Sequence, residues 1–243
     1  MLLNFRIFII SFLIYLLDLV TFYPRLKKII LLNLGNPPKL VLDVGGNKGQ
    51  TISFFLNLNK HAKIVSFEPT KSLHEYLIKK YNSFSNVTIS NKGISSFSGE
   101  KKFYENHLNL TSSFEKLNYY SDYLKFKTKI LGIDKNKIIK KEYNVKVITL
   151  SSYINDNLKS DIDIIKIDVE GHEYECLKGL FNTPLNLNIH LIQLEHHNDD
   201  MYENSISFNQ INDILNENNF ELIERLNHAF GDFEDLLYKN KML

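Results

Sequence analysis

Acidic side chains end three apolar runs of this 243-residue chain, and each stands close to a turn-forming residue. Asp43 precedes a glycine-rich turn, Glu68 precedes a proline, and Asp168 lies three residues before Gly171. Charged residues rarely enter a buried strand without a partner, so we expect these carboxylates to emerge at strand ends. The pattern predicts a ligand site in which carboxylates hold cationic groups or hydroxyls.

The turn after Asp43 reads GGNKG and opens a predicted helix. Glycines allow a nucleotide to approach the backbone closely. The dinucleotide fingerprint Gly-x-Gly-x-x-Gly fails here, because a motif that ends at Gly49 has Val44 in its first glycine position. The pattern Asp-x-Gly-x-Gly-x-Gly, typical of S-adenosyl-L-methionine (SAM) sites, fits with Asn47 in place of the middle glycine. Asn tolerates unusual backbone angles better than most residues.

Asp43 also favours SAM, since a carboxylate can orient an ammonium group and would repel a pyrophosphate. The second acidic residue, Glu68, follows Asp43 by 25 residues, and its two oxygens can accept both ribose hydroxyls. That role fits NAD as well. We therefore predict SAM as the cofactor, bound by Asp43, Gly45, Gly46, Asn47, Gly49 and Glu68.

The third acidic segment, residues 163–173, reads DIIKIDVEGHE. Strand alternation places Lys166, Asp168 and Glu170 on one side of the backbone. Deprotonation of a hydroxyl benefits from a general base, and His172 is the first candidate because imidazole titrates near neutral pH. Asp168 is the alternative proton acceptor. We predict Asp168, Glu170 and His172 as catalytic residues, with Asp168 also at the cofactor.

A further polar group, Glu195-His196-His197, follows another apolar run. Together with Asp168 it could bind a divalent metal that acidifies a hydroxyl. The spacing matches no diagnostic metal motif, and adjacent histidines on a strand point to opposite sides. We therefore predict no metal, and assign Glu195 and His196 to substrate binding.

Apolar runs that alternate with helical periodicity indicate a doubly wound α/β sheet. The C-terminal segments 220–226 and 233–238 are typical of a terminal strand pair. Strands are predicted at 39–44, 62–67, 87–90, 145–150, 163–169 and 187–194, and helices at 49–58, 71–81, 152–157, 173–181 and 208–218. The polar segment 91–144, strand-like only at 101–104, is predicted to be an insertion that covers the active site.

Residues 7–23 are predominantly apolar and are near the ~20 residues that a spanning helix needs. The basic residues at 25–28 would keep the remainder cytoplasmic if this segment spanned a membrane. The alternatives are a helix packed on the domain or on a second subunit, and a signal peptide, although no small-residue cleavage site follows. We expect residues 1–35 to form a hydrophobic helical segment, a candidate membrane anchor, and residues 36–243 to form one cytoplasmic domain.

The formal net charge is only +1, and few of the basic residues are arginines, so we expect no nucleic-acid partner. The single cysteine, Cys176, excludes an internal disulfide framework. Composition does not predict the oligomeric state.

Together the segments LDVGGNKGQ, SFEP, NKGISSFSGEKKFY, VITLSSYI and IKIDVEGHEYECLKG resemble the FkbM-type SAM-dependent methyltransferases. The resemblance runs from about residue 39 to residue 179. It implies a Rossmann-like class I methyltransferase fold, a doubly wound, mostly parallel sheet with an antiparallel C-terminal strand. It also implies that Asn91 lies near the adenine and that Asp168, Glu170 and His172 face the transferred methyl group.

The function implied by the resemblance is O-methylation of a hydroxyl on a small molecule or glycan, with sugars as frequent family substrates. The alternative is an NAD-dependent oxidoreductase or epimerase of Rossmann type. Val44 in the glycine motif and the charge of Asp43 disfavour that alternative.

Overall fold

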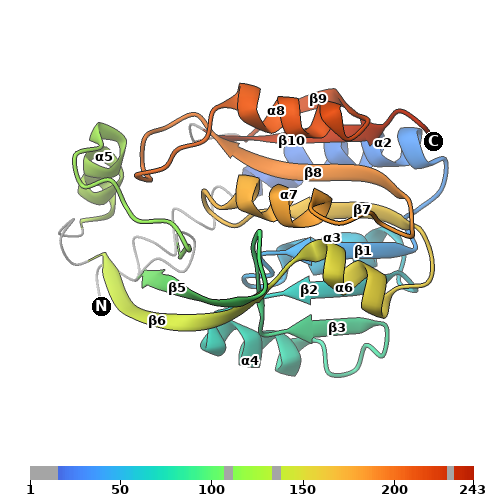
Figure 1. The fold of residues 1–243 in the computed structure, drawn as a ribbon, viewed down its shortest axis with the longest axis horizontal. Coiled ribbons are helices and arrows are strands. Elements are labelled where there is room, and N and C mark those ends of the chain that lie inside the picture. Colours follow the sequence, from blue (N-terminus) through green and yellow to red (C-terminus); the bar gives the residue numbers. More distant parts are fainter. Residues whose placement is uncertain (1–15, 107–111, 133–137, 229–232) are drawn as a thin grey trace.

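The computed structural model describes residues 16–106, 112–132, 138–228 and 233–243 (Figure 1). A seven-stranded sheet lies at the centre of these residues, in the order β3-β2-β1-β7-β8-β10-β9. Its strands are β1 (Leu40–Val44), β2 (Lys63–Phe67), β3 (Val87–Ser90), β7 (Ile162–Ile167), β8 (Ile189–His197), β9 (Phe220–Asn227) and β10 (Phe233–Asn240).

Strands β3, β2, β1, β7 and β8 are parallel, whereas β10 is antiparallel to both β8 and β9. The strand order reverses between β1 and β7, which are paired. In such sheets the ligand crevice lies outside the carboxyl ends of the strands at that switch point. The arrangement confirms the predicted doubly wound, mostly parallel α/β sheet with an antiparallel C-terminal strand.

Helices cover both faces of this sheet, because successive residues of each buried strand point to opposite sides. On β1, Val41 packs in the core with α2, α3 and α4, whereas Leu42 packs in the core with α6, α7 and α8. The helices are α2 (Phe22–Leu34), α3 (Gln50–Leu58), α4 (Lys71–Lys80), α6 (Leu150–Asn157), α7 (Glu173–Phe181) and α8 (Phe208–Glu217).

The segment 91–144 contains more regular structure than the sequence predicts. It holds β4 (Gly93–Ile94), β5 (Gly99–Asn106), α5 (Asp122–Leu131) and the first part of β6 (Ile139–Ile148). A second sheet, in the order β4-β6-β5, lies beyond the carboxyl ends of the main strands (Figure 1). Strands β5 and β6 are polar and pair with each other, so the stabilising partner is remote in sequence and local periodicity finds only parts of them, at 101–104 and 145–150. Strand β6 ends at Ile148, and Leu150 already belongs to α6.

Helix α2 buries Phe22, Leu26 and Ile30 against the main sheet, in the same core as α3. Residues 1–15 lie outside the described residues, and so does most of the candidate anchor at 7–23. Among the residues that the structure describes, no helix has both the length and the apolar character to cross a membrane.

Candidate active site

A cleft opens at the carboxyl ends of β1, β2 and β7. Its lining includes five of the predicted site residues: Gly45, Asn47, Glu68, Asp168 and Glu170. Strand β5 supplies Phe103, and the segment between β5 and α5 supplies Ser112 and Phe114. The main sheet therefore contributes carboxylates and backbone to the cleft, and the insertion contributes aromatic rings and a hydroxyl.

The turn after β1 requires glycine at its first position. Gly45 has a φ of 96°, a backbone conformation that residues other than glycine rarely adopt. A Cβ there would overlap the backbone carbonyl of Asp168. Asn47 follows at φ 43°, and its backbone N–H donates to Glu68 Oε2 over 2.8 Å. The glycine therefore lets the turn pass close to the backbone of Asp168.

Four predicted cofactor residues lie outside the cleft lining: Asp43, Gly46, Gly49 and Asn91. A Cβ on Gly46 would overlap Ser66 Oγ, and one on Gly49 would lie 2.7 Å from the Tyr81 ring. These glycines therefore pack the turn against the structure beneath it. Asn91 is solvent-exposed, after the end of β3.

Asp43 is fully buried on the helix α3 side of β1, beneath the glycine turn. Its Oδ2 accepts a 2.7 Å hydrogen bond from Ser66 Oγ, whereas Oδ1 has no hydrogen-bond partner among the described residues. Burial raises the pKa of Asp43 to about 6. A buried carboxylate oxygen without a donor is unfavourable, so a ligand that brings a cationic donor would satisfy it.

Glu68 joins the strand end to both flanking turns. Its Oε2 accepts from Asn47 N, and its Oε1 accepts from Thr70 N at 2.7 Å. Burial raises its pKa to about 7. Each oxygen has a second lone pair, so the carboxylate can still accept hydrogen bonds from a vicinal diol.

Asp168 lies just after β7, with about a third of its side chain exposed to the cleft. The Lys166 ammonium is 2.6 Å from its Oδ2. Burial acts to raise the pKa of Asp168, but the charge of Lys166 outweighs it and keeps that pKa below its usual value. Asp168 is therefore an ionised acceptor next to the glycine turn.

Glu170 has a φ of 58°, an uncommon conformation for a residue with a long side chain. The turn around it is held by Glu173, whose Oε1 accepts from the backbone N–H groups of Val169 and Gly171. Tyr202 OH donates to Glu170 Oε2 over 3.1 Å. Burial raises the pKa of Glu170 to about 8.

The structure brings together Glu195 and His197 rather than Glu195 and His196. Strand β8 continues to His197, three residues beyond its predicted end, so the two-residue alternation puts Glu195 and His197 on one side. His196 points to the other side, where its ring lies 6.2 Å from that of Phe208. The geometry therefore does not support the prediction that Glu195 and His196 contact the same substrate.

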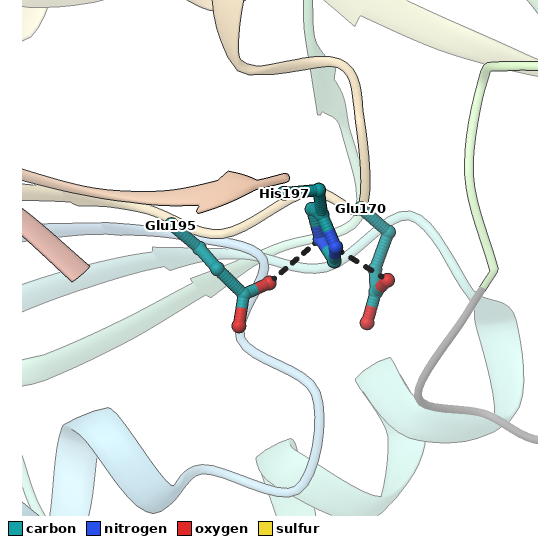
Figure 2. A group of neighbouring side chains, drawn as sticks. All are labelled: Glu170, Glu195 and His197. Carbon is teal, nitrogen blue, oxygen red and sulfur yellow. Dashed lines mark ion pairs between the residues drawn. The ribbon is translucent and has the colours of Figure 1, made fainter. Parts of the chain in front are cut away.

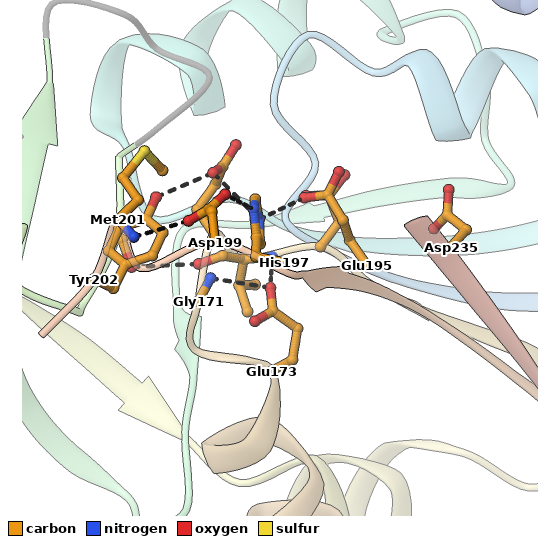
Figure 3. A network of polar contacts seen from close by, with 12 residues as sticks. Gly171, Glu173, Glu195, His197, Asp199, Met201, Tyr202 and Asp235 are labelled. Atoms are coloured by element: carbon orange, nitrogen blue, oxygen red, sulfur yellow. Dashed lines mark hydrogen bonds and ion pairs between the residues drawn. The ribbon is translucent and has the colours of Figure 1, made fainter. Parts of the chain in front are cut away.

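Figure 2 shows Glu195 and Glu170 on either side of the His197 ring. His197 Nε2 is 3.1 Å from Glu195 Oε2 and 3.7 Å from Glu170 Oε2. On its other edge, His197 Nδ1 faces Asp199 Oδ2 at 3.5 Å, and Asp199 in turn accepts from Met201 N (Figure 3). Burial acts to lower the pKa of His197, but the surrounding carboxylates raise it well above its usual value. The cluster thus favours positive charge at its centre.

His172 occupies a different environment from the one predicted for a general base. Its side chain is fully buried, with Nδ1 at 2.6 Å from Glu115 Oε1 and Nε2 at 3.1 Å from Ser95 Oγ. Burial lowers its pKa. Because both ring nitrogens are already hydrogen-bonded inside the protein, His172 connects α7 to the insertion and has no free nitrogen for a substrate.

Strand alternation places Lys166 and Asp168 on one side, and the structure pairs them. Sequence reasoning missed Phe103 and Phe114 as cleft residues. No local signal places the two phenylalanines in the cleft, because Phe103 is positioned by the pairing of β5 with β6 and Phe114 packs against it.

The sequence matches the profile of one protein family, described as the Methyltransferase FkbM domain, over residues 43–222. This range includes the site residues of both sheets, from Asp43 to His197. No curated relative matches the chain by sequence.

Solved structures with a similar fold include two methyltransferases. The magnesium protoporphyrin IX methyltransferase from Synechocystis PCC 6803, solved with bound SAM, has 13% identity and a TM-score of 0.49, over 90% of this chain and 79% of that chain. The N-methyltransferase NodS from Bradyrhizobium japonicum WM9 has 10% identity and a TM-score of 0.49, over 90% of this chain and 93% of that chain.

Proposed function

Because this chain belongs to the FkbM family of SAM-dependent methyltransferases, we propose that it transfers the methyl group of SAM to a hydroxyl of a sugar or glycan-type acceptor. The family match supports the methyltransferase over the NAD-dependent oxidoreductase or epimerase. The broken dinucleotide fingerprint at Val44 agrees with it.

Two features of the cleft fit SAM. The buried Asp43 Oδ1 lacks a donor, and the SAM ammonium can supply one, directly or through a water molecule. Gly45 lines the same cleft, so its backbone can contact the methionine end of the cofactor. Glu68 would hold the ribose hydroxyls, since it already lies in the cleft lining. When bound, SAM supplies an electrophilic methyl group on a sulfonium.

The observation that carries the proposal is the position of Asp168. Its backbone carbonyl contacts the Gly45 turn, and its partly exposed carboxylate lines the same cleft. An acceptor hydroxyl beside Asp168 would therefore lie next to the methionine end of the cofactor. Asp168 takes the hydroxyl proton as the O–CH3 bond forms and the S–CH3 bond breaks, and S-adenosylhomocysteine leaves.

The chain's other groups position the acceptor and exclude water. Lys166 keeps Asp168 ionised and limits its movement through their 2.6 Å contact. The aromatic rings of Phe103 and Phe114 offer apolar surface to the C–H faces of a sugar, and Ser112 offers a hydroxyl. A carbohydrate presents both kinds of surface, so the mixed lining supports a sugar acceptor.

The test measures cofactor binding and methyl transfer separately. Calorimetry should show micromolar binding of S-adenosylhomocysteine to the full-length chain. Labelled methyl from SAM should appear on a panel of sugars and glycans as an alkali-stable ether. Asp168→Asn should lower kcat at least about 100-fold. The matched control Asp161→Asn, at the opposite end of β7 from the cleft, should keep normal kcat.

Absence of S-adenosylhomocysteine binding in the folded chain would refute the methyltransferase mechanism. An alkali-labile ester or a methylated amine as the product would refute O-methylation of a hydroxyl. An unchanged kcat in Asp168→Asn would exclude Asp168 as the proton acceptor.

A further inference from the structure

We propose that Glu170, Glu195 and His197 form a binding site for one divalent transition-metal ion at the acceptor end of the cleft. The role of this ion in catalysis rests on the proposed function, because it would bind the acceptor hydroxyl. The existence of the site rests on geometry alone.

The three side chains converge from the ends of two neighbouring strands. One ligand atom from each lies within 4.8 Å of the others. His197 Nε2 is 3.1 Å from Glu195 Oε2 and 3.7 Å from Glu170 Oε2 (Figure 2). Donors that share an ion at about 2.1 Å from each lie roughly 3.0–3.4 Å apart. Small side-chain adjustments would therefore bring all three onto a common ion.

The histidine supplies an observation independent of the acidic residues. The His197 side chain is nine-tenths buried, yet its Nε2 makes no hydrogen bond of normal geometry among the described residues. Its other nitrogen, Nδ1, faces Asp199 Oδ2 at 3.5 Å. A carboxylate behind the non-ligating nitrogen is the usual support of a metal-bound histidine, because it fixes the orientation of the ring. His197 Nε2 then points at the two glutamates.

Charge balance favours a doubly charged occupant. Lys166 pairs with Asp168, and among the described residues the ion-pair partner of Glu170 and Glu195 is His197 rather than a lysine or arginine. Tyr202 contributes only a neutral hydroxyl to Glu170. One divalent ion would neutralise both glutamates in place of His197, which would release its Nε2 proton on binding the ion. The imidazole ligand favours Mn²⁺, Fe²⁺, Co²⁺ or Zn²⁺ over Mg²⁺ or Ca²⁺.

The site also makes chemical sense beside Asp168. Three protein ligands leave coordination positions open for an acceptor hydroxyl. A bound cation lowers the pKa of that hydroxyl, so an ionised and weakly basic carboxylate is sufficient to take the proton. Glu170 lines the cofactor cleft as well, so the ion would lie between the cleft and the end of β8.

The test uses Mn²⁺ as the probe and the full-length chain after chelation and desalting. Electron paramagnetic resonance of free Mn²⁺ at pH 7.5 should show one ion bound per chain, with a micromolar Kd. His197→Gln and Glu195→Gln should each weaken binding at least tenfold. The matched control His196→Gln, adjacent in β8 but pointing to the other face, should keep the wild-type Kd. Thermal melting of each variant confirms that it folds.

The inference fails if the folded wild-type chain binds no Mn²⁺ saturably, or if His197→Gln binds as tightly as the control. If the His197 variant does not fold, Glu195→Gln and the wild-type titration decide. Calorimetry with S-adenosylhomocysteine on the same samples separates the two proposals. Cofactor binding without Mn²⁺ binding overturns the metal site only, whereas Mn²⁺ binding without cofactor binding supports the site and overturns the proposed methyl transfer.

Discussion

Asp43→Asn should make the protein more stable at neutral pH while it weakens cofactor binding. Asp43 is completely buried, and only one of its two oxygens has a hydrogen-bond donor among the described residues. Burial raises its pKa from 3.8 to about 6, so the folded chain holds a proton here more tightly than the unfolded chain does. The contribution of Asp43 to the free energy of unfolding therefore falls as the pH rises from about 4 to 6, and it stays at this lower value above pH 6.

The magnitude follows from that difference in pKa. A rise of about 2 pH units corresponds to about 3 kcal/mol of unfolding free energy lost once Asp43 is fully ionised. At pH 5, where Asp43 is largely protonated in the folded chain, the same treatment gives about half of this loss. Asn keeps an oxygen for Ser66 and carries no charge, at a cost of about 1 kcal/mol for its unpaired amide.

The assay is urea unfolding of wild type and Asp43→Asn at pH 8 and pH 5, followed by circular dichroism. The variant should be more stable by about 1–2 kcal/mol at pH 8, and this advantage should shrink by about 1.4 kcal/mol at pH 5. An exposed aspartate on α6, Asp156, provides the control Asp156→Asn, which should show no such pH-dependent difference. A stability difference that does not change with pH would refute the reasoning.

Cofactor binding provides the second half of this prediction. The amide that Asp43→Asn introduces would present N–H groups where the carboxylate presents an acceptor, so it cannot receive the ammonium of the cofactor. Loss of a charge-assisted hydrogen bond is worth about 1.5–3 kcal/mol, so the Kd for S-adenosylhomocysteine should rise at least tenfold at pH 8. An unchanged Kd would show that Asp43 does not contact the ammonium, directly or through water.

Three further predictions concern the turn, the ribose carboxylate and the buried histidine. Gly45→Ala should destabilise the fold by at least about 2 kcal/mol in urea unfolding and abolish cofactor binding, because the new Cβ would overlap the backbone at a position of positive φ. The control Gly99→Ala, whose Cβ would make only ordinary contacts, should change the unfolding free energy by less than about 0.5 kcal/mol. When the pH is lowered from 8 to 6, the affinity for S-adenosylhomocysteine measured by calorimetry should weaken by up to about tenfold. The reason is that burial raises the pKa of Glu68 to about 7, and the ionised carboxylate holds the ribose. Glu68→Gln should lose this pH dependence. His172→Gln should lower the unfolding free energy by about 1–3 kcal/mol, because the fully buried ring and its contacts with Glu115 and Ser95 are lost. An unchanged unfolding free energy would contradict a structural role for these hydrogen bonds.

Much of the cofactor end of the site was predictable from the sequence. The run that ends at Asp43, the GGNKG turn and Glu68 each lie within one strand–turn–helix unit. Local periodicity and backbone sterics decide such units, and parallel strands bring their carboxyl ends to one edge of the sheet. The glycine at position 45 shows the limit of this reasoning, because the group that excludes a Cβ there is the carbonyl of Asp168, just after another strand, β7.

The acceptor end depended on the tertiary structure. The sequence placed His172 next to catalytic carboxylates, but Glu115 and Ser95, 57 and 77 residues away, enclose its ring. The sequence analysis paired His196 with Glu195. Strand β8 extends to His197 because it pairs with β10, and His197 therefore lies on the same face of the sheet as Glu195.

The sequence by itself therefore determined the order of strands and helices, the glycine turn and the carboxylates that follow β1, β2 and β7. Only the tertiary structure decided the second sheet, the burial of His172 and the meeting of Glu170, Glu195 and His197. The physical reason is range: propensity and alternation act over a few residues, whereas burial and charge neighbours depend on chain segments that meet only after folding.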